Sequence, residues 1–147
     1  MKKYYPYHKR DAIKNYFPMP NEIFSLGLTY GEISVYSFLM SCEDRKTFQC
    51  HPSYKTIGRA LHMSPNTVKK YVDGLREKQL ITTESTKVTL KSGRTHNGNL
   101  RYTIRPIGEA VKYHYEQQMI RLDEESQRQK ALNKLAEYDR KHGKTTV

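Results

Sequence analysis

The sequence predicts a mainly helical α+β domain that ends in a long helix, and three observations support this class. Two helix-capping residues, Ser53 and Ser64, stand eleven positions apart and indicate two short helices that meet at a tight corner. Two segments of alternating polar and apolar residues follow, 81–90 and 100–104, and turn-forming residues separate them. From residue 107 onward the chain lacks proline and is almost free of glycine, which predicts a helix of up to roughly 35 residues, about 50 Å long.

Most of the positive charge lies in the first two thirds of the chain. The 147 residues include 26 Lys and Arg against 15 Asp and Glu, which gives a net charge of +11. Residues 1–20 carry +4, residues 21–106 carry +6 and residues 107–147 carry +1. An excess of this size indicates a polyanionic partner, above all nucleic acid. We expect a basic arm over residues 1–18, one domain over residues 19–106 and a helical extension over residues 107–147.

Hydropathy and cysteine content predict a soluble, cytoplasmic protein without a membrane partner. The sequence has no apolar run of 18 residues, and its first residues lack the apolar stretch of a signal peptide. Cys42 and Cys50 are too few for a disulfide scaffold, which fits a reducing compartment. We expect Cys42 to be buried as a small hydrophobic residue at the end of its helix.

The N-terminal arm interleaves basic and aromatic residues without a helical or strand period. Three structures remain open for it: a poorly ordered terminus, an arm that lies along DNA, or a strand that docks on the domain. Pro18 and Pro20 end the arm, and a short helical turn is expected from Asn21.

The first long helix of the domain is predicted over residues 30–42. Thr29 and Glu32 form a capping box at its start. Apolar residues then recur at helical spacing and are expected to face inward: Ile33, Val35, Tyr36, Phe38, Leu39 and Met40.

Two further helices are predicted on either side of the corner. Ser53 caps the first, which turns Ile57, Ala60 and Leu61 inward and ends at His62 and Met63. Ser64 caps the second, which has Pro65 at its first position and runs to about residue 79. Its expected inward stripe is Val68, Tyr71, Val72 and Leu75, and its expected outward face is Pro65, Asn66, Lys69, Lys70 and Asp73.

The alternating segments 81–90 and 100–104 are predicted to form a β-hairpin with a long basic tip over residues 91–99. The predicted order of elements is that of a winged helix-turn-helix: a helix, a tight turn, a second helix and then a hairpin. Gly58 stands where a small residue lets the two helices cross closely, and Met63 is expected to fill the corner.

Residues 52–82 resemble the winged helix-turn-helix DNA-binding superfamily of bacterial and phage proteins. The matching positions are Pro52-Ser53, Thr56-Ile57-Gly58, Leu61, Ser64, Thr67-Val68, Val72, Leu75 and Leu80-Ile81. Two positions depart from the pattern: Gly58 replaces the usual alanine, and His62 occupies a turn position that often holds glycine with positive φ. Residues 17–36 are also similar to the N-terminal domain of plasmid replication initiators of Gram-positive bacteria.

A helix of this kind reaches base edges when it enters the major groove of DNA. We expect the helix from Ser64 to supply the sequence-specific contacts, with Asn66 toward adenine and Lys69 or Lys70 toward guanine or phosphate. The start of the preceding helix is expected to bind a phosphate, and the wing tip is expected to contact the minor groove or the backbone. The full predicted set is Ser53, Tyr54, Lys55, Ser64, Pro65, Asn66, Thr67, Lys69, Lys70, Lys91, Arg94 and His96.

The function that these residues favour is that of a sequence-specific double-stranded DNA-binding protein that regulates transcription. The alternatives are a DNA-binding factor for plasmid or mobile-element replication or conjugation, a winged-helix module that binds proteins, and an RNA-binding protein. We expect no enzymatic activity, cofactor or small-molecule ligand. The spacing of the six histidines and two cysteines predicts no metal site.

The C-terminal extension is nearly neutral and is expected to form a homodimer. Ile107, Val111, Tyr115, Met119 and Leu122 form one apolar cluster, and Leu132, Leu135, Ala136 and Tyr138 form another. The polar stretch over residues 123–130 interrupts the pattern, so the sequence predicts two separate contacts and not one continuous coiled coil. The alternative is a monomer with a solvated tail.

Pairs four residues apart, Glu124 with Arg128 and Glu137 with Lys141, are expected to support the helix.

Overall fold

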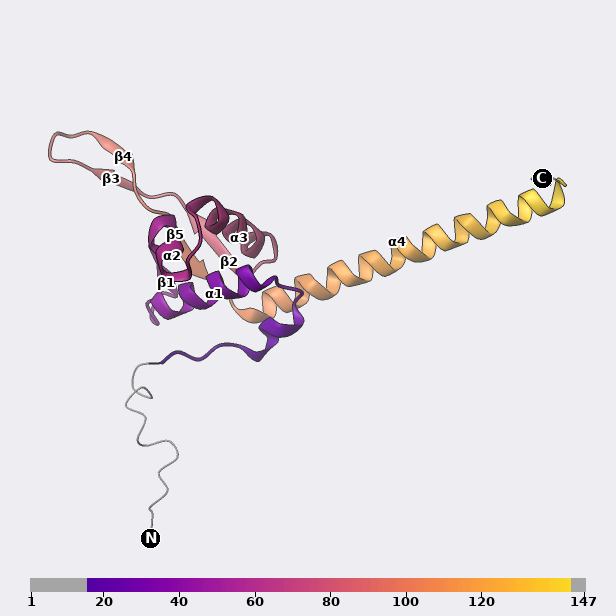
Figure 1. Ribbon diagram of the computed structural model, residues 1–147, viewed down its shortest axis with the longest axis horizontal. Coiled ribbons are helices and arrows are strands. Elements are labelled where there is room, and N and C mark those ends of the chain that lie inside the picture. The colour runs from indigo at the N-terminus through magenta and orange to yellow at the C-terminus, as the bar shows by residue number, and fades with distance from the viewer. Residues whose placement is uncertain (1–15, 144–147) are drawn as a thin grey trace, which may run out of the picture. The chain divides into compact units, whose positions relative to one another are not determined.

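The computed structural model describes residues 16–143, so the N-terminal arm lies mostly outside the described residues. The chain divides into two compact units, one up to Val111 and the other from Lys112. The described part of the first unit contains a short 3-10 helix, three α-helices, five strands and the first residues of the C-terminal helix (Figure 1). The predicted mainly helical α+β class is therefore confirmed.

The first unit opens with η2 (Asn21–Ser25) and α1 (Tyr30–Cys42), both where the sequence predicts them. The capping box at α1 is complete, because Thr29 Oγ1 accepts from Glu32 N at 3.2 Å and Glu32 Oε1 accepts from Thr29 N at 3.0 Å. Val35, Tyr36 and Leu39 are buried. The prediction that Cys42 is buried is wrong, because the fully buried side of α1 ends at Leu39 and the last residues of the helix reach solvent.

The corner consists of α2 (Tyr54–Leu61) and α3 (Pro65–Glu77), each capped by the predicted serine. The Ser53 hydroxyl accepts from Thr56 N at 3.0 Å, and the Ser64 hydroxyl accepts from Thr67 N at 3.2 Å. The prediction that Ala60 faces inward is wrong, because Ile57 and Gly58 fill the core side of α2 and leave Ala60 exposed.

The third helix ends two residues earlier than the sequence predicts. Lys78 is its C-cap, and Gln79 adopts a φ of 67°, which a helix cannot continue. Val68, Val72 and Leu75 are fully buried, whereas Tyr71 is only partly buried, with its ring over Gly31 on α1.

An antiparallel three-stranded sheet with the order β1-β5-β2 packs beside the helices. Its strands are β1 (Gln49–Cys50), β5 (Arg101–Ile104) and β2 (Ile81–Glu84). Ile81 pairs with Ile104 and Gln49 pairs with Thr103. The sequence does not predict β1, because two residues are too few to display an alternating pattern.

The wing is a separate two-stranded hairpin of β3 (Lys87–Thr89) and β4 (Thr95–Asn97), which extends away from the helices in Figure 1. The predicted continuous strand over 81–90 is broken at residues 85–86, where Thr86 Oγ1 donates to the carbonyl of Asn99. The predicted nine-residue tip is shorter, because residues 95–97 belong to β4. Gly93 turns the chain at a φ of 82°, and Leu90 N donates to Arg94 O at 2.8 Å.

The core of the first unit contains one buried charged residue, Glu32, among the described positions. Its carboxylate accepts from Lys78 Nζ at 2.8 Å, and Lys78 also donates to the carbonyl of Gly27 at 3.1 Å. Burial acts to raise the pKa of Glu32, but hydrogen bonds from Lys78 and Thr29 outweigh it and lower the pKa below its ordinary value. This ion pair joins the start of α1 to the end of α3.

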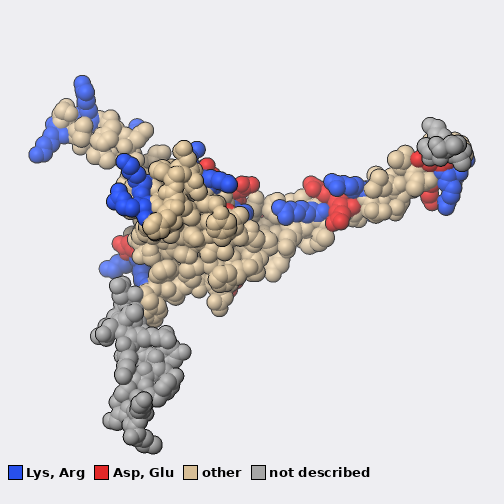
Figure 2. Space-filling model, viewed as in Figure 1, with Lys and Arg blue, Asp and Glu red and all other residues tan. Residues whose placement is uncertain are grey.

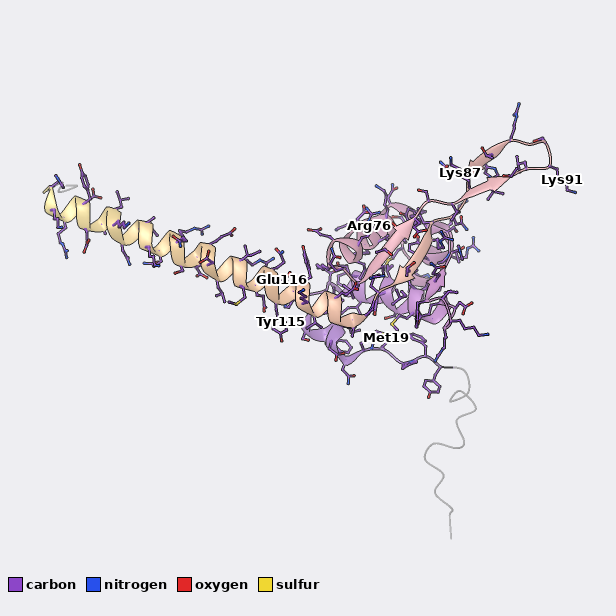
Figure 3. The ribbon with its side chains drawn as sticks, turned by 180° about the vertical axis from the view of Figure 1, so that it is seen from behind. Met19, Arg76, Lys87, Lys91, Tyr115 and Glu116 are labelled. Atoms are coloured by element: carbon purple, nitrogen blue, oxygen red, sulfur yellow. The ribbon has the colours of Figure 1, made fainter. Side chains whose placement is uncertain are left out.

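The C-terminal helix α4 (Ile107–Lys141) has the predicted 35 residues. In the first unit, Ala110 is buried and Ile107 and Val111 pack against the core. In the second unit the large apolar residues of both predicted clusters are exposed, as Figure 3 shows for Tyr115. Glu137 pairs with Arg140 and not with the predicted Lys141. Within residues 16–143 no helix is long and apolar enough to cross a membrane.

Candidate nucleic-acid interface

The corner between α2 and α3 is fixed by Gly58 and His62. A Cβ atom at Gly58 would lie 2.3 Å from the backbone oxygen of Met63, so the turn passes too close for any side chain. His62 adopts a φ of 56°, as the sequence predicts, and its N–H donates to the carbonyl of Gly58. Met63 is partly buried against the core, as expected. The corner therefore sets the angle at which α3 leaves α2.

The first turns of α3 present polar side chains to solvent. Pro65, Asn66, Lys69 and Lys70 are exposed, and Thr67 is partly buried beside the cap. The Asn66 side chain makes no hydrogen bond to another residue within 16–143. An amide in this position is free to donate to and accept from the edge of a base.

The lysines of α3 differ in their surroundings. Lys69 Nζ lies 3.9 Å from the carboxylate of Asp73, which also lies 3.5 Å from Arg76. Lys70 Nζ lies 5.6 Å from the ring centroid of Tyr71. Exposed contacts of this kind are weak, so both ammonium groups can exchange them for a phosphate or a base.

The start of α2 and the base of the wing line one small cavity. Ser53 and Tyr54 line a small cavity of 190 Å³ together with Asn99 and Tyr102. Asn99 Nδ2 donates to the carbonyl of His51 at 3.2 Å, which ties the wing to the chain just before α2. Lys55 is exposed on the first turn of α2. The predicted phosphate site and the wing are thus parts of one surface.

The wing carries its basic residues in solvent. Lys91 and Arg94 lie at the tip, and His96 lies on β4 opposite Val88 rather than at the tip. Figure 3 shows Lys87 and Lys91 on the wing and Arg76 on α3. Lys87 is absent from the predicted set, although a lysine on an exposed strand of a basic hairpin is a recognisable signal.

The surface formed by α2, α3 and the wing is basic. Residues 53–99 contain nine Lys and Arg against three Asp and Glu. On the face seen in Figure 2, Lys and Arg side chains lie on the wing and over the region of α2 and α3. Arg59, exposed in the last turn of α2, is a second basic residue outside the predicted set.

Not every basic residue of this region is free for a ligand. Arg76 donates to Thr83 Oγ1 at 2.9 Å and so joins α3 to β2, and Lys78 is held by Glu32. Arg101 pairs with Glu84 across the sheet. These three residues stabilise the fold. The remaining basic residues are exposed and form what we call the exposed basic set: Lys55, Arg59, Lys69, Lys70, Lys87, Lys91 and Arg94.

Residues 26–81 match a family model described as a helix-turn-helix domain. This match covers α1, α2 and α3, and the strands that follow add the wing. The first unit therefore has the fold of a winged helix-turn-helix. A comparison with curated proteins finds no match.

The chain is also similar to solved structures of transcriptional regulators. A possible transcriptional regulator from Methanosarcina mazei is 17% identical, with 78% of this chain and 97% of that chain covered and a TM-score of 0.46. A regulator of the MarR family from Silicibacter pomeroyi is 16% identical, with 86% and 80% covered and a TM-score of 0.39. A regulator of a Staphylococcus aureus multidrug efflux pump is 14% identical, with 80% and 84% covered and a TM-score of 0.38.

Proposed function

We propose that this chain is a sequence-specific double-stranded DNA-binding protein that regulates transcription. The observation that carries the proposal is the exposed start of α3, where Asn66 stands without a side-chain partner among the described residues beside Lys69 and Lys70. The major groove is about 12 Å wide and admits one helix of this diameter. The match to a helix-turn-helix domain supports the same function.

In the proposed complex each element has its own part. The first turns of α3 contact bases, because a tight corner holds them rigidly. The capped start of α2, with Lys55 beside it, contacts a phosphate, since free N–H groups and the helix dipole favour an anion there. The wing adds Lys87, Lys91 and Arg94 to the backbone or the minor groove.

A role at a replication origin or in conjugation would use the same contacts, so it differs only in where the bound site lies. The likeness of residues 17–36 to plasmid replication initiators is the reason to keep this second role. A protein-binding role would not need the exposed basic set on α2, α3 and the wing. An RNA-binding role is disfavoured because the sequence lacks the aromatic strand motifs of RNA-recognition domains.

We further propose that the protein is a homodimer through the second unit. The supporting observation is the exposure of Met119, Leu122, Leu132 and Leu135 on the part of α4 that forms the second unit. A dimer would place two α3 helices on half-sites about one turn of DNA apart and make the site a palindrome.

Selection from random duplexes tests the proposed function. We expect the full chain to enrich one sequence and to bind it at least about a thousandfold more tightly than a scrambled duplex at the same salt concentration. A site that overlaps a promoter supports regulation, and a site at an origin supports the replication role. Equal affinity for every duplex, or preference for RNA, would contradict the proposal.

A further inference from the structure

A pocket of 320 Å³ lies on the first unit, away from α2, α3 and the wing. Tyr36, Met40 and Glu43 line it from the end of α1, at positions that share one side of the helix. Its other walls are mostly apolar and come from three further segments: Pro20, Phe48, Ile104, Arg105, Pro106 and Ile107. Known small-molecule sites have volumes of roughly 300–1,000 Å³, so this pocket is large enough for a small ligand.

Glu43 provides a buried hydrogen-bond acceptor beside these apolar walls. Its Oε2 atom is buried and accepts no hydrogen bond from the residues that the structure describes. Burial raises the pKa of the Glu43 carboxyl, and the positive charge of Arg45 only partly offsets this effect. A buried acceptor without a donor is costly and is uncommon in folded proteins.

Two of the cations near this pocket have partners of their own. Arg105 donates to both carboxylate oxygens of Glu109, at 3.0 and 2.7 Å. Arg45 donates to the carbonyl of Tyr16 at 3.1 Å. Burial and the Glu43 carboxylate raise the pKa of Tyr36 to about 12, so Tyr36 stays neutral. Among the described residues no cation forms an ion pair with the Glu43 carboxylate, so a ligand can supply the positive group that pairs with it.

Phe48 stands at the rim of the pocket in a strained conformation. Its φ is 59°, a region that bulky residues rarely adopt, and the residue is 53% exposed. Two backbone hydrogen bonds keep Phe48 in this strained conformation. Phe48 N donates to Asp44 O at 2.6 Å, and Ile104 N donates to Phe48 O at 2.9 Å. Strain that the surroundings enforce is typical of ligand-binding positions. Here it keeps an aromatic ring at the pocket mouth.

We propose that this pocket binds a small aromatic molecule with a positively charged amine. The ammonium group pairs with the carboxylate of Glu43, which lines the pocket, and the aromatic body fills the space between Met40, Phe48 and Ile107. A ligand in this place contacts both α1 and the first residue of α4. The proposal goes beyond DNA binding, and its test uses no DNA, so either can fail without the other.

Titration of the ¹⁵N-labelled full chain with three related compounds tests the proposal. Tryptamine carries the aromatic ring and the amine, indole lacks the amine, and indole-3-propionic acid replaces it with a carboxylate. We expect tryptamine to shift the amide signals of Met40, Phe48 and Ile107, indole to bind more weakly, and the acid to bind least. Glu43→Gln should weaken tryptamine binding about tenfold or more, because it removes the charge and keeps the shape.

Glu125→Gln is the matched control, since it removes an exposed carboxylate from α4, outside the pocket. It should leave tryptamine binding unchanged. The comparison of the three compounds on the unaltered chain remains decisive even if Glu43→Gln fails to fold. Absence of tryptamine binding at millimolar concentration, equal binding of the acid, or shifts confined to residues outside the pocket would overturn the proposal.

Discussion

The Glu32 carboxylate shows how a single residue ties distant parts of the fold together. It caps α1 through Thr29 and pairs with Lys78, which follows α3 by one residue. Its lowered pKa means that the folded state favours the charged form. The charged Glu32 carboxylate therefore stabilises the folded state at pH values above its ordinary pKa of 4.5. This stabilisation is lost as the pH falls through the lower pKa that Glu32 has in the folded state.

Replacement of Glu32 with Gln tests this linkage. Gln keeps an oxygen for the cap of α1 but has no charge for Lys78, so Glu32→Gln should lower the free energy of unfolding at pH 7. The difference from the unaltered chain should shrink as the pH falls below 4.5 and through the lower pKa of the folded state. Urea unfolding across this range measures it. Glu22→Gln, at an exposed position of η2, is the control, and a constant difference at every pH would contradict the assignment.

Gly58 is required by the closeness of the α2–α3 turn. Gly58→Ala would bring a methyl group to 2.3 Å from the Met63 carbonyl oxygen, and a backbone atom must then move. We expect a decrease of about 1–3 kcal/mol in the free energy of unfolding. Gly108→Ala is the control, because a Cβ at Gly108 meets no atom within 4 Å and alanine favours the helix. Equal stability of the two variants in urea would show that the α2–α3 turn can move to accommodate the added methyl group at little cost in free energy.

Asn66 carries the prediction for base recognition. Asn66→Ala should weaken binding to the best selected duplex by about 1–3 kcal/mol and should change binding to a scrambled duplex little. Asn21→Ala removes an exposed amide from η2 and should affect neither. Fluorescence anisotropy with both duplexes measures the effect. An equal decrease on the two duplexes would mean that Asn66 contacts only the backbone.

The wing is the element whose basic residues are proposed to bind phosphates. Removal of one lysine or arginine that neutralises a phosphate should reduce the slope of log K against log salt by about 0.9. Arg94→Ala should therefore flatten the slope by nearly one unit and weaken binding to all duplexes alike. Lys130→Ala removes the same charge from α4 and should leave the slope unchanged. If Arg94→Ala does not alter the slope either, the wing tip lies outside the interface.

At the scale of elements, local signals predicted the helices and long-range contacts decided the rest. Capping residues act within one turn, so Thr29, Ser53 and Ser64 marked three helix starts correctly. The break of the hairpin at Thr86 depends on hydrogen bonds with residues 98 and 99, which an alternating pattern cannot reveal.

The same distinction applies to the site. Exposure of Asn66, Lys69 and Lys70 follows from helical period, and the structure agrees with it. The packing of Ser53 and Tyr54 against the wing base brings together residues almost fifty positions apart, and the pocket beside Glu43 joins four segments. Arrangements of this kind depend on tertiary packing, for which one sequence holds no local signal.

At the scale of the whole molecule, the second unit is a single helix whose large apolar side chains are exposed. Isolated helices in water are marginal unless an apolar side is covered. At about 100° per residue, Tyr115, Met119 and Leu122 share one side of α4, and Leu132, Leu135 and Tyr138 share the nearly opposite side. One continuous stripe is therefore absent from α4, and the two clusters need separate partners.

The dimer prediction concerns the second of these clusters. Light scattering of the full chain at tens of micromolar should return twice the 17.3 kDa mass of one chain. Leu132→Ser with Leu135→Ser should return a single-chain mass and reduce the helix signal in circular dichroism, because exposed leucines stabilise α4 only when a second copy covers them.

Gln127→Ser with Gln129→Ser is the matched control, because it places the same residue type in the polar stretch of α4 and should leave the dimer intact. Disruption of the dimer should also change DNA binding, since each chain then contacts one half-site and binds a palindrome with the affinity of a single site. A mass of 17.3 kDa for the unaltered chain, together with an asymmetric selected site, would contradict the prediction and leave α4 as a solvated extension.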